Sequence, residues 1–160
     1  MVQYFQGDLL TSGCNAICHQ TNCMGVMGSG IAKQIRYSFP NVYEAFRYRY
    51  NNGRAALGEC DFVFTELKSK NGHGYYGYVV NCYSQFNYLP RGVKHTDYDA
   101  FRACCKKIKK EFKYFTDFRI GFPYKIGSGL GGGDWEVMKN IIEEEFKDPE
   151  WRVEVWQLNC

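Results

Sequence analysis

The chain has 160 residues, of which 45% are apolar and 23% charged, proportions that suit a single globular domain of roughly 100–200 residues. They exclude a disordered chain, and without a long uncharged apolar stretch the sequence predicts no transmembrane helix of about 20 residues. The net charge of +3 is too small for a dedicated nucleic-acid binder, and we expect the lysines of residues 106–113 on a solvated helix face. The first residues lack the basic lead and apolar core of a secretory signal, so we expect one cytoplasmic domain over residues 1–160.

Cysteine usage indicates reduced thiols. Eight cysteines in 160 residues fall below the roughly 8–10% that is typical of a disulfide scaffold. The nearest approach to a metal motif is Cys14, Cys18, His19 and Cys23, but this spacing fits no standard zinc finger and lacks a second ligand pair. We therefore expect buried thiols that pack as small hydrophobic side chains, with no metal site and no cofactor.

The first half of the chain alternates strand and helix patterns. Val2–Phe5 and Asn15–His19 are short β-rich runs that predict the first two strands. The apolar spacing within residues 31–39 predicts a helix that ends at Pro40, and this proline can itself open the next helix. A polar turn that ends in Gly53 predicts the end of that second helix.

The second half continues the alternation. Two β-rich runs separated by a turn with Gly72 predict a hairpin, and a helical period of apolar residues begins at Asp97. Asp134 is placed to cap the last helix. The predicted strands are Cys60–Glu66, Tyr75–Cys82, Phe118–Phe122 and Val153–Leu158, and the predicted helices are Asp97–Phe115 and Trp135–Phe146.

Strands interleaved with helices predict an α/β fold, in which helices cover both faces of a largely parallel or mixed sheet. In such sheets ligands bind outside the carboxyl ends of the strands, where loops lead into helix N-termini. Two loops occupy such positions, Thr21–Gly30 and Gly127–Gly133. We therefore expect the binding site between them.

Both loops are rich in glycine, which lets the backbone approach a ligand closely, so that consecutive N–H groups can converge on an anion. Each following helix would add the partial positive charge of its N-terminus. Two such loops suit two linked phosphates, although tight turns alone would also explain the glycines. Residues 127–132 match the dinucleotide pattern GxGxxG, but only one helix and one strand follow, which argues against a nicotinamide dehydrogenase.

Four polar side chains accompany the loops. His19 ends the predicted second strand, where it is either a satisfied core residue or a candidate acid, base or nucleophile. Asn22 carries an amide that can hydrogen-bond ribose hydroxyls. Asp8 suits either an adenine amino group or a turn, and a capping role alone would explain Asp134.

At these residues the chain resembles the macro domain family, whose members are three-layer α/β/α modules that bind ADP-ribose. Gly7-Asp8-Leu9-Leu10 looks like the family's adenine motif, and Asn22 matches the last position of its ribose motif. Residues 25–32 and 126–135 look like its two phosphate loops. The resemblance implies a ligand-binding set of Asp8, Leu9, Asn22, Gly25, Met27, Gly28, Ser29, Gly30, Ile31, Gly127, Ser128, Gly129, Leu130, Gly131 and Gly132.

A histidine before the asparagine, together with the run from Gly131 to Trp135, is similar to the branch of ADP-ribose 1″-phosphate phosphatases. This resemblance implies hydrolysis of the terminal phosphate, with His19 as nucleophile or general acid and Asp134 activating water or orienting the histidine. The implied partner is a small molecule, ADP-ribose or ADP-ribose 1″-phosphate. No membrane is expected, and nucleic acid is expected only as a modified substrate.

Two alternatives stay open. The first is an ADP-ribosyl hydrolase that removes ADP-ribose from DNA or protein, because the first glycine-rich loop of this chain is also similar to that branch. Members of that branch commonly use a lysine shortly after the central strand and an aspartate in the second loop. Here the stretch Asn81–Gln85 holds no lysine, and the loop position is Gly131. The other alternative is a module that binds ADP-ribose without turning it over.

Overall fold

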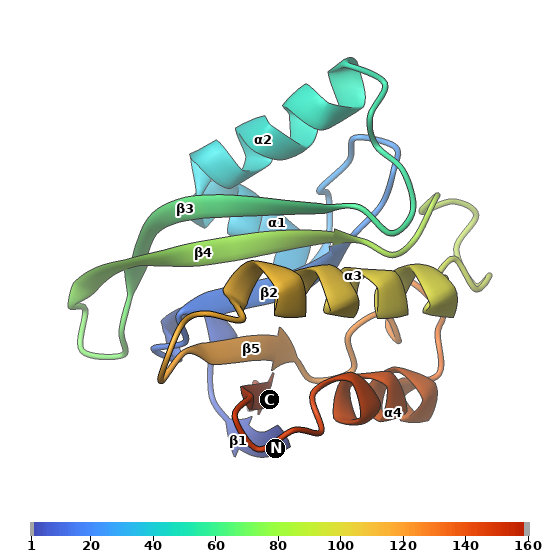
Figure 1. The fold of residues 1–160 in the computed structure, drawn as a ribbon. Helices are drawn as coiled ribbons and strands as arrows, with labels where there is room; N and C mark the ends of the chain where they lie inside the picture. The colour runs from blue at the N-terminus through green and yellow to red at the C-terminus, as the bar shows by residue number, and fades with distance from the viewer. Residues whose placement is uncertain (1, 159–160) are drawn as a thin grey trace.

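A computed structural model describes residues 2–158, which form a central six-stranded sheet (Figure 1). The strand order is β1-β6-β5-β2-β4-β3. Neighbouring strands run parallel, except that β3 and β4 form an antiparallel hairpin at one edge. The strands are β1 (Val2–Gln6), β2 (Ala16–Thr21), β3 (Cys60–Lys68), β4 (Gly74–Tyr83), β5 (Arg119–Pro123) and β6 (Arg152–Gln157).

Helices cover both faces of the sheet, and each face has its own apolar core (Figure 1). On one face α3 and α4 pack through residues such as Phe101 and Ile141, and on the other α1 and α2 pack through Ile35 and Val42. This arrangement confirms the predicted three-layer α/β/α fold with a mixed, largely parallel sheet. The helices are α1 (Gly30–Ser38), α2 (Pro40–Asn51), α3 (Tyr98–Phe112), α4 (Trp135–Glu145) and the short 3₁₀ helix η1 (Leu9–Thr11). Within residues 2–158, no helix combines the length and the apolar character needed to cross a membrane.

Strand β2 runs further than its sequence pattern predicts. The pattern ends the strand at His19, whereas the pairing with β4 continues to Thr21, which lies opposite Tyr83. His19 is therefore an interior residue of the central sheet, opposite Asn81, and the prediction that it ends the strand is wrong. The polar side chains after Cys18 mask this extension in the sequence, although His19 and Thr21 are buried and Gln20 forms hydrogen bonds within the fold.

The end of α3 also differs from the prediction. Asp97 caps the helix by accepting a hydrogen bond from the Ala100 N–H (2.9 Å), as its position suggests. The helix ends at Phe112, three residues before the predicted Phe115. Phe115 follows the apolar period of the helix but lies in the turn after it. Its ring packs there against Phe118, with the ring centroids 4.8 Å apart.

Several lysines of α3 form ion pairs at the surface, and the side chains of Lys106 (62% exposed) and Lys107 (41% exposed) stay accessible to solvent, as expected of a solvated face. Lys109 lies 3.0 Å and Lys106 3.3 Å from the carboxylate of Glu145 on α4, and that carboxylate is largely buried. Lys107 pairs with Glu59 at 3.0 Å. The run of positive charge thus joins α3 to α4 and to the segment before β3.

A buried ion pair links β5 to β6. Nε and Nη2 of Arg119 donate to the carboxylate of Glu154 at 2.7 and 2.8 Å, and the side chain of Glu154 is only 5% exposed. The same carboxylate accepts bonds from the indole Nε1 of Trp156 (2.9 Å) and from the thiol of Cys14 (3.3 Å). Four donors therefore satisfy a charge that lies almost out of contact with solvent.

The cysteines confirm the expectation of buried thiols. The free cysteines that the structure describes are all buried: Cys14, Cys18, Cys23, Cys60, Cys82, Cys104 and Cys105. Most of them belong to the core beneath α3 and α4.

Candidate ligand-binding site

The candidate site is a cavity of about 810 Å³ at the carboxyl ends of the parallel strands. Its walls come from the residues after β1, the glycine-rich loops after β2 and β5, the segment after β4 and the end of β6. These segments are far apart in the sequence but meet because parallel strands end at the same edge of the sheet. The cavity lies where the sequence predicts it.

Asn22 organises the first glycine-rich loop. Its Nδ2 donates to the carbonyl of Val26 (2.7 Å), and its Oδ1 accepts from the N–H of Met24 (2.9 Å). Met27 then anchors the loop, because its side chain is buried in a small core with Phe46. Asn22 lines the cavity, but most of its hydrogen bonds are made to the backbone of the loop and hold the loop in its conformation.

Thr96 and Gln20 hold the second glycine-rich loop. The Thr96 hydroxyl donates to the carbonyl of Gly127 (2.7 Å) and accepts from Nε2 of Gln20 (3.0 Å). The Thr96 N–H also donates to the carbonyl of Gly131 (3.0 Å). Gln20 further donates to Oε1 of Gln85 (2.7 Å), so one side chain of β2 connects the second loop to the segment after β4.

Gly127 is a position where the second loop requires glycine. Its φ is +71°, and a Cβ there would lie 2.8 Å from Oε1 of Gln20 and 2.9 Å from Cε of Met138. We expect Gly127→Ala to lower the free energy of unfolding by about 1–2 kcal/mol, measured by urea denaturation. Gly129→Ala is the matched control, because a Cβ at Gly129 would meet nothing within 4 Å. Equal stability of the two variants would contradict this account of the loop.

Most of the predicted ligand-binding residues line the cavity. They are Asp8, Leu9, Asn22, Gly28, Ser29, Gly30, Ile31, Gly127, Gly129, Leu130 and Gly131.

The remaining predicted residues shape the loops from outside the cavity wall. Gly25 approaches the ring of Tyr50, to which a Cβ would come within 2.7 Å. Met27 is the buried anchor of the first loop. Ser128 donates its hydroxyl to the carbonyl of Ile126 (3.3 Å), and Gly132 is exposed, with φ +71°.

His19 lies beneath the cavity wall, fully buried on the face of the sheet covered by α1 and α2. Nδ2 of Asn81 donates to Asp61 (3.1 Å), which turns Oδ1 of Asn81 toward Nε2 of His19 at 2.6 Å. Nε2 therefore carries the proton, and Nδ1 has no hydrogen-bond partner among the described residues. Burial lowers the pKa of His19 to about 4, although the bond to Asn81 opposes this, so the ring is neutral near pH 7.

Asp134 is an exposed capping residue outside the cavity. Its side chain accepts a hydrogen bond from the Glu136 N–H (2.9 Å) at the start of α4, and its own N–H donates to Oη of Tyr98 (2.9 Å). Helix α4 packs on the face of the sheet opposite to His19. The structure thus does not bring together the two residues that the sequence pairs as catalytic, because β2 buries one and α4 uses the other as its cap.

The cavity wall also contains residues that sequence reasoning misses, among them Gln20, Gln85 and Trp156. Each lies at or just after the carboxyl end of a strand, a position that indicates the site only once the strand order is known. Trp156 presents a fixed plane, because its indole donates to Glu154 and its ring stacks on Phe5 with centroids 5.0 Å apart.

The charged residues of the cavity wall favour an anionic ligand. Within the part of the chain that the structure describes, they are Arg91, Lys125 and Asp8. The carboxylate of Asp8 is already engaged, since it accepts a bond from the Leu10 N–H at 2.9 Å. Two cations and one engaged carboxylate therefore line the cavity.

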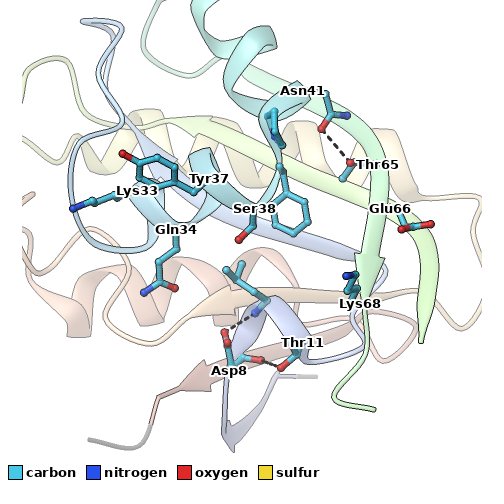
Figure 2. A pocket seen from close by; sticks show the side chains of 13 residues that line it. Asp8, Thr11, Lys33, Gln34, Tyr37, Ser38, Asn41, Thr65, Glu66 and Lys68 are labelled. Carbon is cyan, nitrogen blue, oxygen red and sulfur yellow. Dashed lines mark hydrogen bonds between the residues drawn. The ribbon is translucent and has the colours of Figure 1, made fainter. Parts of the chain in front are cut away.

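A second cavity of about 830 Å³ adjoins the first and shares Asp8 and Gln34 with it (Figure 2). It lies between η1, α1, the start of α2 and β3, with Asn41 and Thr65 hydrogen-bonded at 3.1 Å on its wall. The glycine-rich loops do not reach it, and its lysines are balanced by carboxylates. The cavity between the loops is therefore the better candidate for an anionic ligand.

Comparisons with known proteins identify the family to which this fold belongs. No protein-family model matches the chain. The ADP-ribose 1″-phosphate phosphatase of Scheffersomyces stipitis is 38% identical over 90% of this chain and 94% of that protein. The macrodomain of Mycobacterium tuberculosis DarG shares the fold, with a TM-score of 0.78 and 22% identity over 98% of each chain. The chain belongs to the macro domain family.

This macro domain also matches a larger protein. The DNA ADP-ribosyl glycohydrolase of Mycobacterium tuberculosis is 35% identical over 92% of the chain. The chain spans only 39% of the length of that glycohydrolase. Relatives of this macro domain therefore include two different hydrolases.

Proposed function

We propose that this macro domain binds ADP-ribose in the cavity between its glycine-rich loops and hydrolyses the terminal phosphate of ADP-ribose 1″-phosphate. The observation that carries the proposal is the convergence of two glycine-rich loops on one cavity whose wall bears Arg91 and Lys125. Two loops suit the two phosphates of ADP-ribose, and the cations favour a ligand of high negative charge.

The start of α1 supports the phosphate role of the first loop. Gly30, the first residue of the helix, lines the cavity, and Ser29 at the cap position makes no side-chain capping bond. The first turn of α1 carries no acidic residue. The N–H groups of this turn are thus left to a ligand, and the helix dipole favours an anion there.

Trp156 supports an adenine site in the same cavity. Its fixed plane lines the cavity together with Asp8, and Gly7 passes so close that a Cβ there would lie 2.8 Å from the indole ring. Stacking on a flat base needs such an immobile aromatic face. We assign these binding roles to residues of the cavity wall and none to His19 or Asp134, which lie outside it.

Two observations favour the phosphatase activity over the glycohydrolase activity. The phosphatase relative matches along nearly its whole length, whereas the glycohydrolase matches only in part. The stretch in which the glycohydrolase branch commonly has its lysine ends here in Gln85, and the loop position of its aspartate is Gly131. Loop N–H groups and the cations Arg91 and Lys125 would stabilise the charge that develops on the phosphate oxygens during attack by water.

Phosphate release from ADP-ribose 1″-phosphate tests the proposal. We expect turnover by the unmodified protein, and ADP-ribose binding in calorimetry. Asp134→Ala should turn over the substrate within about twofold of the unmodified protein, because the replaced side chain caps α4 outside the cavity. Arg91→Gln should release phosphate at least tenfold more slowly, because it removes one of the two cations of the wall.

The same experiment separates the alternatives. ADP-ribose binding without phosphate release would reject the phosphatase activity and leave the glycohydrolase or the non-catalytic module. Release of ADP-ribose from modified DNA would then identify the glycohydrolase. Absence of ADP-ribose binding would reject the proposed function as a whole.

A further inference from the structure

A cluster of three thiols lies away from the ligand cavity, in the core beneath α3. Cys60 on β3, Cys82 on β4 and Cys104 on α3 place their Sγ atoms within 4.8 Å of one another. Cys60 and Cys82 are directly paired across the hairpin, and Cys104 covers them from the helix. Each of the three thiols contacts the other two, so that their sulfur atoms form a closed triangle.

The dimensions of this triangle suit a metal ion. Zinc lies about 2.3 Å from a cysteine sulfur, so three sulfurs around one ion in a plane are roughly 4 Å apart. The thiols of the cluster need to move by only a few tenths of an ångström to reach that separation. Sulfur is also the donor that selects thiophilic ions over Mg²⁺ or Ca²⁺, which prefer oxygen.

We propose that Cys60, Cys82 and Cys104 form a binding site for one thiophilic divalent metal ion of the zinc group. Binding releases three protons and forms three metal–sulfur bonds, which leaves a single net negative charge in the core. Without a metal, the hydrogen bonds that the thiols share both raise and lower their pKa values, and burial raises the pKa of all three, so that each pKa lies far above its usual range and the thiols are protonated. The dication therefore reduces three buried negative charges to one.

The sequence does not reveal this site, because its ligands come from three elements and share no short motif. The residues whose spacing is nearest to a zinc motif, Cys14, Cys18, His19 and Cys23, do not gather into such a group within residues 2–158. The proposed site has a structural consequence, since it would join β3, β4 and α3 at Cys82, two residues before Ser84. The hydroxyl of Ser84 donates to Gln20, the side chain that holds the second glycine-rich loop (2.7 Å).

Titration of the reduced protein with Cd²⁺ tests the site through the ultraviolet charge-transfer band of cadmium thiolates. We expect the band to saturate at an equimolar ratio. Cys82→Ala should abolish the band. Cys23→Ala is the matched control, because Cys23 is equally a buried thiol but belongs to a separate core, and this variant should keep the band.

A second measurement does not depend on any variant. Zn²⁺ should raise the midpoint of thermal unfolding of the unmodified protein, because the ion binds the folded chain. Absence of the cadmium band, its persistence in Cys82→Ala or its loss in Cys23→Ala would each overturn the proposal, as would an unchanged unfolding midpoint. These readouts require neither ADP-ribose nor turnover, so their outcome is independent of the proposed function.

Discussion

Arg119→Met should lower the free energy of unfolding by roughly 3–5 kcal/mol, a large share of the stability of a domain of this size. The substitution leaves the carboxylate of Glu154, whose side chain is 5% exposed, without its cation. The indole of Trp156 and the thiol of Cys14 remain as donors, but neither carries a charge. Urea denaturation monitored by tryptophan fluorescence would measure the loss.

A double variant separates the loss of the cation from the loss of packing. Arg119→Met combined with Glu154→Gln removes the unpaired charge while keeping a hydrogen-bonding group beside Trp156. We expect the double variant to be more stable than Arg119→Met alone, because the main cost is the uncompensated carboxylate. If the double variant were the less stable of the two, the buried charge would not be the source of the loss.

Acidification should destabilise the protein through His19 by roughly 3 kcal/mol between about pH 7 and about pH 4. Burial lowers the pKa of this histidine from 6.5 to about 4 in the folded protein. The unfolded chain therefore takes up a proton at His19 as the pH falls below about 6.5, while the folded protein stays neutral at this site. The contribution of the neutral ring to stability is complete above that pH and is lost as the pH falls toward 4.

His19→Gln provides the comparison, because glutamine does not titrate and its amide can still donate to Asn81. The free energy of unfolding of both proteins is measured at a series of pH values. We expect the two values to converge as the pH falls. Burial opposes ionisation of Glu145 and Glu154, but bonds from neighbouring cations lower the pKa of each below its usual 4.5. Data above pH 4.5 therefore report mainly on His19. Parallel curves for the two proteins would show that His19 does not titrate as its burial requires.

The fold was largely predictable because its signals are local. Apolar spacing marked each helix, proline and glycine marked the turn between α1 and α2 and the hairpin, and aspartates marked the starts of α3 and α4. The error at the end of α3 has the same origin, because Phe115 follows the helical period without belonging to the helix. Local patterns thus predict which elements exist. They do not predict the residue at which a helix ends when apolar residues beyond it still pack against the core.

The candidate site was predictable only in its loops. The glycine-rich segments are visible in the sequence, whereas the burial of His19 depends on Asn81, a partner 62 positions away on β4. The support of the second loop likewise depends on Gln20 and Thr96, which are 76 positions apart. Such pairings follow from the order of the strands in the sheet, and no local pattern contains that order.

The strand order also bears on how the chain folds while it is being made. Strand β1 lies at the edge of the sheet beside β6, and Val2 pairs with Val153. A ribosome therefore releases β1 first but must translate β6 before β1 has a neighbour in the sheet. The strands between them in the sequence can assemble earlier, because β2 pairs with β4 and with β5 at shorter separations along the chain. Of the six strands of this sheet, the first to be translated is thus expected to be the last to join it.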